Sequence, residues 1–213
     1  TRQNWKSAVL IVLAFVGIYI VRTVVSVAVQ GVSDGSGMQY VKEWAAMFKD
    51  PMMWLNIAAL PINYFFVFIA FFGEEYGWRY YLQPVLQKRF GLRAGVIILG
   101  VVWGLWHIPD DLFYYTQTSG IQMIFAQQIT CISLGIFFAY AYMKTQNIWV
   151  PVCLHYLNNN LIPIISGTFS ADVLENQTVS WKDLPVALVL NGLCFGFFLL
   201  ADVFNKKEIQ KED

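Results

Sequence analysis

The sequence is dominated by long apolar segments, and these restrict what the chain can fold into more than any other feature. A helix needs about 20 mostly apolar residues to cross a membrane. Stretches near this length occur six times in the 213 residues, at about 8–30, 54–82, 94–109, 121–143, 148–166 and 184–204. The residues between them are too few for a second, soluble domain. We therefore expect an all-α, polytopic membrane helix bundle of about six transmembrane helices, with residues 1–213 forming a single membrane domain.

Composition excludes other classes of protein. Charged residues make up 13% of the chain, whereas soluble domains contain about 25%. This shortage of charge argues against both a soluble globule and a disordered chain. The net charge is +0 and no basic cluster stands out, so we expect the lipid bilayer rather than nucleic acid as a partner. The three cysteines lie in apolar segments, without the spacing of a disulfide framework or a metal site.

Basic residues set the expected orientation, because short cytoplasmic loops carry an excess of Lys and Arg. One arrangement of the six helices fits every loop, and it predicts an integral membrane protein with both termini in the cytoplasm. The opposite loops are mainly acidic and carry few basic residues, among them Lys182. The basic residues that we place on the cytoplasmic side are Arg2, Lys6, Lys88, Arg89, Arg93, Lys144, Lys206, Lys207 and Lys211.

Ionisable side chains inside spanning segments are costly, so each one calls for an explanation. Both histidines of the chain are among them. Arg22 and Asp202 belong to no motif, and we expect structural roles for them. Asp110 and Asp111, beyond the third segment, are expected to form a solvated turn. The full set inside the segments is Arg22, Glu74, Glu75, Arg79, His107, His155 and Asp202.

Helical spacing separates the two neighbouring carboxylates. Glu75 and Arg79 are four residues apart, so they share a helix face and can pair. Glu74 is five residues from Arg79 and points to the side, which leaves it without a local counter-ion. This arrangement needs a second helix that does not stop at Gly73. We predict that the helix is continuous across 73–82.

Two further helices direct polar groups toward the same interior. His107 lies near the end of the third segment, one turn after Trp103, and Pro109 prevents that helix from continuing normally. His155 and Asn159 are four residues apart and share one face of the fifth helix. Asn159 stands between two other asparagines, and any of the three can simply join helices. The spacing from His155 favours Asn159 as the functional one.

These groups are suitable for hydrolysing an amide bond. Glu74 can take a proton from water, and His107 can hold the same water molecule. His155 and Asn159 can donate hydrogen bonds to the oxyanion that develops on the scissile carbonyl. No Ser or Cys has a comparable set of partners, and the sequence has no HExxH zinc helix.

Three short motifs give the chain a resemblance to a known family. EEYGWR (Glu74–Arg79) is similar to a Glu-Glu-x-x-x-Arg motif, WGLWH (Trp103–His107) to an aromatic-x-x-x-His motif, and HYLNN (His155–Asn159) to a His-x-x-x-Asn motif. In this order they resemble the CPBP family of intramembrane proteases. That family includes CAAX prenyl endopeptidases of the Ras-converting type and the Abi group of bacteriocin-immunity proteins. The resemblance covers about residues 60–165. The Gly-Trp-Arg residues of the first motif are similar to bacterial members more than to eukaryotic CAAX enzymes, so we expect a protein of a bacterial cell membrane.

The resemblance implies a glutamate-dependent endopeptidase that acts on a small peptide or protein tail, in bacteriocin self-immunity or peptide maturation. By the resemblance, Glu74 and His107 activate water, while His155 with Asn159 lines the oxyanion site. By the same resemblance, Glu75 and Arg79 complete the first motif. The implied site residues are Glu74, Glu75, Arg79, His107, His155 and Asn159.

Other functions stay open at this point. Glu74, His107 and His155 can in principle hold zinc with one open position, although we expect no cofactor because the resemblance points to glutamate catalysis. A non-catalytic immunity or scaffold protein would keep the motifs without cleaving anything. A proton-coupled transporter also needs buried Glu and His, but the sequence lacks the inverted repeats common in such proteins.

Overall fold

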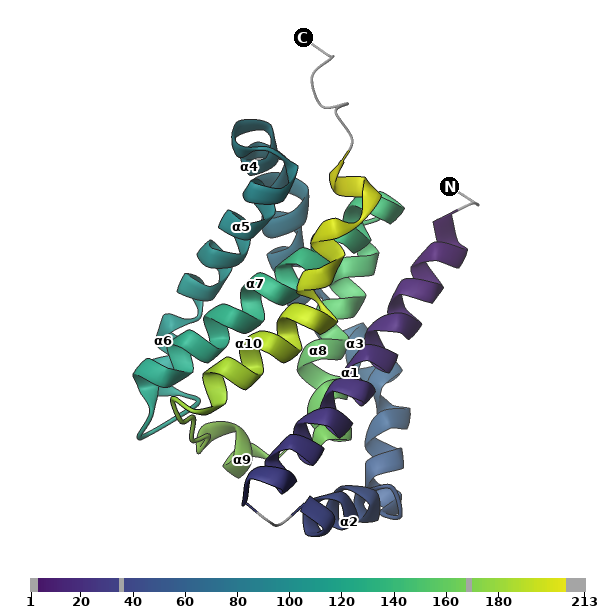
Figure 1. Cartoon of the computed structure of the whole chain (residues 1–213). Helices are drawn as coiled ribbons and strands as arrows, with labels where there is room; N and C mark the ends of the chain where they lie inside the picture. Colours follow the sequence, from purple (N-terminus) through teal and green to yellow (C-terminus); the bar gives the residue numbers. More distant parts are fainter. Residues whose placement is uncertain (1–3, 35–36, 168–169, 206–213) are drawn as a thin grey trace.

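Every regular element that the structure describes is a helix. The structure is a computed structural model, and it describes residues 4–34, 37–167 and 170–205. The long helices lie side by side in a bundle (Figure 1). This arrangement confirms the prediction of an all-α, polytopic membrane bundle. The helices of the bundle are α1 (Asn4–Asp34), α3 (Pro51–Glu75), α5 (Leu92–Trp106), α7 (Gly120–Thr145), α8 (Trp149–Ser166) and α10 (Asp183–Cys194).

Four helical stretches are long and apolar enough to cross a membrane: Asn4–Val29, Pro51–Phe90, Leu92–Phe113 and Gly120–Thr145. The other two predicted segments are also helical but do not meet this requirement among the described residues. α8 carries a histidine and three consecutive asparagines in its middle. α10 has 12 residues and is followed by two short 3₁₀ helices, η2 (Gly196–Leu200) and η3 (Asp202–Phe204).

The second span is one continuous helical rod that changes type in its middle. α3 is followed without a break by the π-helix η1 (Tyr76–Leu82) and then by α4 (Gln83–Phe90). The predicted continuity across 73–82 is therefore confirmed, but the turns are wider than expected. Gln83 N–H donates to the carbonyl oxygen of Trp78, five residues back. Pro84 favours this widening, because in an α-helix its ring clashes with the carbonyl group four residues earlier.

Small residues bring α5 against α7. A Cβ atom placed on Gly100 would lie 2.6 Å from the Cα of Ile132, and one on Gly104 would lie equally close to the Gln128 side chain. Helices in membranes use such residues to approach each other closely. The contact matters for the site because α5 carries Trp103, while α7 carries several side chains packed beneath it.

A cluster of buried rings fixes α1 to the rest of the bundle. Phe15 contacts Tyr19, Phe137, Phe138 and Phe195, with ring centroids 5.0 to 6.0 Å apart. These rings come from α1, from α7 and from the residue that follows α10. The cluster buries one face of α1, so Tyr19 points into the bundle rather than toward lipid.

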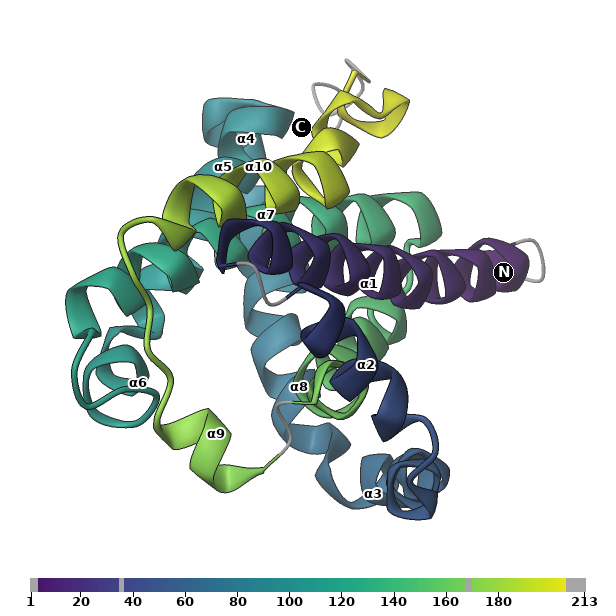
Figure 2. The same cartoon turned by 60° about the horizontal axis from the view of Figure 1, so that its bottom comes forward.

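Hydrogen bonds between helix ends agree with the prediction that both ends of the chain and the basic loops lie on the same side of the bundle. Asn4 Nδ2 donates to the Thr145 carbonyl oxygen at 2.8 Å, and Arg93 Nη2 donates to Asn205 Oδ1 at 2.6 Å. The starts of α1 and α5, the end of α7 and the last described residues therefore lie at one end of the bundle (Figure 1). The helices α2 (Gly37–Met47) and α9 (Ala171–Glu175) lie at the opposite end, which Figure 2 brings forward. Which of these ends faces the cytoplasm stays a prediction.

Candidate active site

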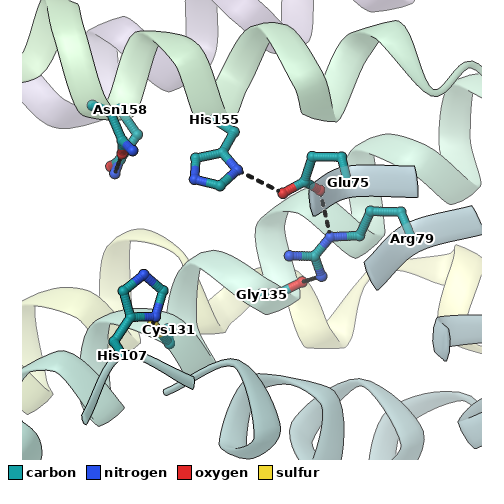
Figure 3. A network of polar contacts seen from close by, with 8 residues as sticks. Glu75, Arg79, His107, Cys131, Gly135, His155 and Asn158 are labelled. Carbon is teal, nitrogen blue, oxygen red and sulfur yellow. Dashed lines mark hydrogen bonds and ion pairs between the residues drawn. The ribbon is translucent and has the colours of Figure 1, made fainter. Parts of the chain in front are cut away.

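A buried chain of three side chains forms the centre of the candidate site. Glu75 Oε2 accepts a hydrogen bond from Arg79 Nε at 2.8 Å, and Glu75 Oε1 accepts one from His155 Nδ1 at 2.9 Å (Figure 3). The side chains of Glu75 and Arg79 are both 0% exposed. The pairing predicted from their spacing is confirmed. Because both oxygens of Glu75 are occupied, this carboxylate is committed to holding its two neighbours.

Arg79 ties the π-helix to the neighbouring helices. Its Nη1 donates to the Gly135 carbonyl oxygen of α7 at 3.2 Å. Its guanidinium carbon lies 5.3 Å from the centre of the Trp103 ring and 5.4 Å from that of Phe138. A buried cation is costly unless it is paired and hydrogen-bonded. Glu75 and the two rings supply that compensation here.

His155 is held in one orientation by this network. Its Nδ1 carries the proton that it donates to Glu75, which leaves Nε2 to face the interior. The ring packs edge-on against Phe71 and Trp103, with centroids 5.2 and 5.4 Å away. In Figure 3 the imidazole projects from α8 into the space that His107 faces from the other side. A carboxylate thus orients a histidine whose second nitrogen remains available.

His107 occupies the break between two helices. α5 ends at Trp106 and α6 (Ile108–Phe113) begins beyond it, so the interruption expected from Pro109 is present. The backbone of His107 has φ −85 and ψ −3, the bridge region in which many active-site residues lie. Its Nδ1 donates to the Trp103 carbonyl oxygen at 2.9 Å, and Cys131 Sγ lies 3.8 Å from the same nitrogen. As in His155, Nε2 has no partner within the described chain.

Glu74 is placed quite differently from its neighbour. Adjacent positions on a helix point about 100° apart, so only one of the two carboxylates can face α8. Glu74 Oε2 is buried and has no hydrogen-bond partner in the part of the chain that is described. Glu74 lines a cavity of about 410 Å³ whose other walls are Gly73, Gly77, Trp78, Tyr81, Leu82 and Trp106.

The donor atoms do not form the zinc site considered from the sequence. His155 bonds to Glu75 and not to Glu74. In residues 4–34, 37–167 and 170–205, no three His, Cys, Asp or Glu side chains form a group that can hold a metal ion. The set Glu74, His107 and His155 thus forms no such group among the described residues, and the expectation that no cofactor is needed stays a prediction.

The three consecutive asparagines have different surroundings. Asn158 Oδ1 accepts from the Tyr19 hydroxyl at 2.6 Å, which joins α8 to α1. Asn160 Oδ1 accepts from Asn63 Nδ2 at 3.3 Å, which joins α8 to α3. Asn159 Oδ1 accepts from Asn158 Nδ2 at 2.9 Å. The amide nitrogen of Asn159 has no acceptor among the described residues, so it is the one of the three whose donor group is free.

Two residues at the site were missed from the sequence. Asp111 is 0% exposed, and neither carboxylate oxygen has a hydrogen-bond partner in the described ranges. The expected solvated turn is wrong here, because the chain resumes as α6 and packs against α7. The four-residue spacing from His107 was the available signal. Tyr19 carried no such signal, because it stands in a largely apolar segment outside every motif. Tyr115 lies beyond the span that ends at Phe113. Its burial and the nearby Asp110 and Asp111 raise the pKa of its hydroxyl to about 12, so the hydroxyl keeps its proton.

Comparison with known proteins points to this same part of the chain. Residues 56–161, which contain all six motif residues, match the model of a family described as type II CAAX prenyl endopeptidase Rce1-like. CAAX prenyl protease 2 from Methanococcus maripaludis is 27% identical over 125 residues, which cover 54% of this chain and 45% of that protein. The chain therefore aligns with less than half of the length of that relative. No solved structure matches the chain.

Proposed function

Because the chain belongs to the Rce1-like family of type II CAAX prenyl endopeptidases, we propose that it is an intramembrane endopeptidase that uses Glu74 to activate water. The observation that carries this proposal is the difference between two adjacent carboxylates. Glu75 has both oxygens occupied, whereas Glu74 presents an unpartnered oxygen at the wall of a cavity. Of these two adjacent carboxylates, only Glu74 is free to take a proton.

The water-activating pair is Glu74 with His107. A carboxylate with an unoccupied oxygen can accept a proton from a water molecule as that molecule attacks a carbonyl carbon. His107 can accept a hydrogen bond through Nε2, because Nδ1 is already engaged with Trp103. The proton can then pass to the leaving amine. Every step uses side chains of this chain.

The oxyanion that forms during attack needs donors on the other side of the scissile bond. Asn159 offers its free amide nitrogen, and His155 offers Nε2 when that nitrogen is protonated. Glu75 stabilises the protonated imidazole, and Arg79 balances the charge of Glu75. Preorganised donors of this kind stabilise the negative charge that develops on an oxyanion. Glu75 and Arg79 are thus positioning residues in this proposal.

The cavity beside Glu74 suits an apolar part of the substrate. Apart from Glu74, its walls are formed by two glycines and by leucine, tyrosine and tryptophan side chains. We propose a small peptide or protein tail whose apolar segment enters here from the membrane. A prenylated CAAX tail, which the family name describes, fits this chemistry. An unmodified apolar peptide in bacteriocin self-immunity or peptide maturation, in a bacterial cell membrane, fits it as well.

The test uses purified protein in proteoliposomes with a panel of prenylated and unmodified apolar peptides, followed by mass spectrometry of the products. Wild type and the exposed control Glu43→Gln should cleave at equal rates. Glu74→Gln should lose at least about 100-fold in rate, the scale of general-base catalysis. Cleavage by Glu74→Gln at the wild-type rate would overturn the proposal. An immunity or scaffold protein predicts instead that Glu74→Gln still protects the cell, and a transporter predicts solute flux into the liposomes.

A further inference from the structure

We infer that Tyr19 of α1 is a positioning residue that fixes the amide of Asn159, acting through Asn158. The inference rests on the proposed function, in which the Asn159 amide nitrogen binds the oxyanion. It adds a residue from a helix that lies outside 56–161, the part of the chain matched by the family. The argument follows the direction of two consecutive hydrogen bonds.

The first bond has a defined direction. The Tyr19 hydroxyl lies 2.6 Å from Asn158 Oδ1. This separation is typical of an O–H···O bond and is shorter than the usual N–H···O range of 2.7 to about 3.2 Å. An amide nitrogen therefore does not fit the position next to Tyr19. The hydroxyl donates, and the carbonyl end of the Asn158 amide faces α1.

The second bond follows from the first. With its oxygen turned toward Tyr19, Asn158 presents its amide nitrogen to Asn159, and it donates to Asn159 Oδ1 at 2.9 Å. The oxygen of Asn159 is then occupied, and its NH₂ group is the end left for a ligand. Without this constraint, an asparagine amide can turn its oxygen toward the substrate and repel an oxyanion. Tyr19 therefore selects the donor end of Asn159.

Tyr19 itself is held rigidly. Its side chain is 4% exposed, and its ring lies 5.0 Å from that of Phe15 and 5.1 Å from that of Phe195. The guanidinium of Arg22, one turn further along α1, lies over the same ring at 5.7 Å. A hydroxyl on so constrained a ring has little freedom to leave Asn158. Figure 3 shows the Asn158 side chain on the same side of α8 as His155, facing the interior that His107 also faces.

A bond that only joined α1 to α8 would have different consequences, and a double-mutant cycle separates the two. Tyr19→Phe should lower kcat about threefold to tenfold, the loss expected for one neutral hydrogen bond, and leave KM unchanged. Made in an Asn159→Ala background, the same change should lower kcat no further, because no amide remains to be oriented. The control is Tyr64→Phe, which removes a hydroxyl that makes no hydrogen bond to the described residues, and it should cleave like wild type.

A second readout does not depend on cleavage. In protein labelled with ¹⁵N-asparagine, the side-chain NH₂ signals of Asn158 and Asn159 should shift in Tyr19→Phe and stay in place in Tyr64→Phe. Unchanged signals, a wild-type kcat for Tyr19→Phe, or an equal loss in both backgrounds would each overturn the inference. If wild type cleaves nothing but the signals shift, the proposed function fails while the orienting contact stands.

Discussion

Glu74 and Glu75 are adjacent and chemically identical, yet replacing each with Gln should have very different effects on stability. Glu75→Gln leaves the fully buried guanidinium of Arg79 without a counter-ion and removes the charged acceptor of His155. Breaking a buried ion pair by removing one partner costs about 3–5 kcal/mol. Glu74→Gln breaks no hydrogen bond and removes an unpartnered charge, so stability should stay equal or rise slightly.

These free energies translate into a clear difference in melting temperature. For a chain of this length, about 1 kcal/mol shifts Tm by roughly 2–4 °C. Glu75→Gln should therefore lower Tm by about 6–20 °C. Glu74→Gln should remain within about 2 °C of wild type or above it.

The assay is thermal unfolding of the protein in detergent, followed by the fluorescence of its eight tryptophans. Glu43→Gln is the matched control, because Glu43 is exposed and bonds only Gln39 on its own helix. Adding Arg79→Met to Glu75→Gln removes the orphaned charge and should recover part of the lost stability. Equal Tm values for Glu74→Gln and Glu75→Gln would refute the assignment of the two carboxylates.

Three other predictions address packing, the missed aspartate and orientation. Gly100→Val forces a side chain into the backbone of α7 and should destabilise the protein by about 1–3 kcal/mol in thermal unfolding, whereas Gly17→Val, with open space around it, should not. Asp111→Asn removes a buried carboxylate without a partner and should stabilise by about 1–3 kcal/mol, so a lower Tm would reveal a partner for this group. A membrane-impermeant maleimide should label Lys182→Cys in intact cells but Lys144→Cys only after permeabilisation, and the reverse pattern would invert the predicted orientation.

Local geometry explains which parts of the site could be predicted from the sequence. The Glu75–Arg79 pair depends only on four-residue spacing within one helix, so the pattern was enough. The break at His107 followed from the proline two residues later in the same way. Both predictions concern residues that a single helical turn brings together. No knowledge of how the helices pack was needed.

The remaining features depend on packing between distant segments. His155 bonds Glu75 across 80 positions of sequence, and the choice of Glu75 over Glu74 is decided by how α8 lies against α3. Asp111 looked like part of a turn because a proline precedes it, and only the packing of α6 on α7 shows that it is buried. Tyr19 lies 139 positions from its partner Asn158. Nothing in the sequence of this largely apolar helix marks one residue as the contact.

The π-helical stretch has a mechanical consequence for the two glutamates. The hydrogen bond of a π turn joins residues five positions apart, whereas that of an α turn joins residues four apart. η1 therefore accommodates one residue more than α-helical turns would. If η1 changed to α-helical geometry, the preceding helix would rotate by about 100°. This is the angle between neighbouring residues such as Glu74 and Glu75. A slip of a single residue would thus bring one of the two carboxylates into the surroundings that the other now has, without breaking the helix that spans the membrane.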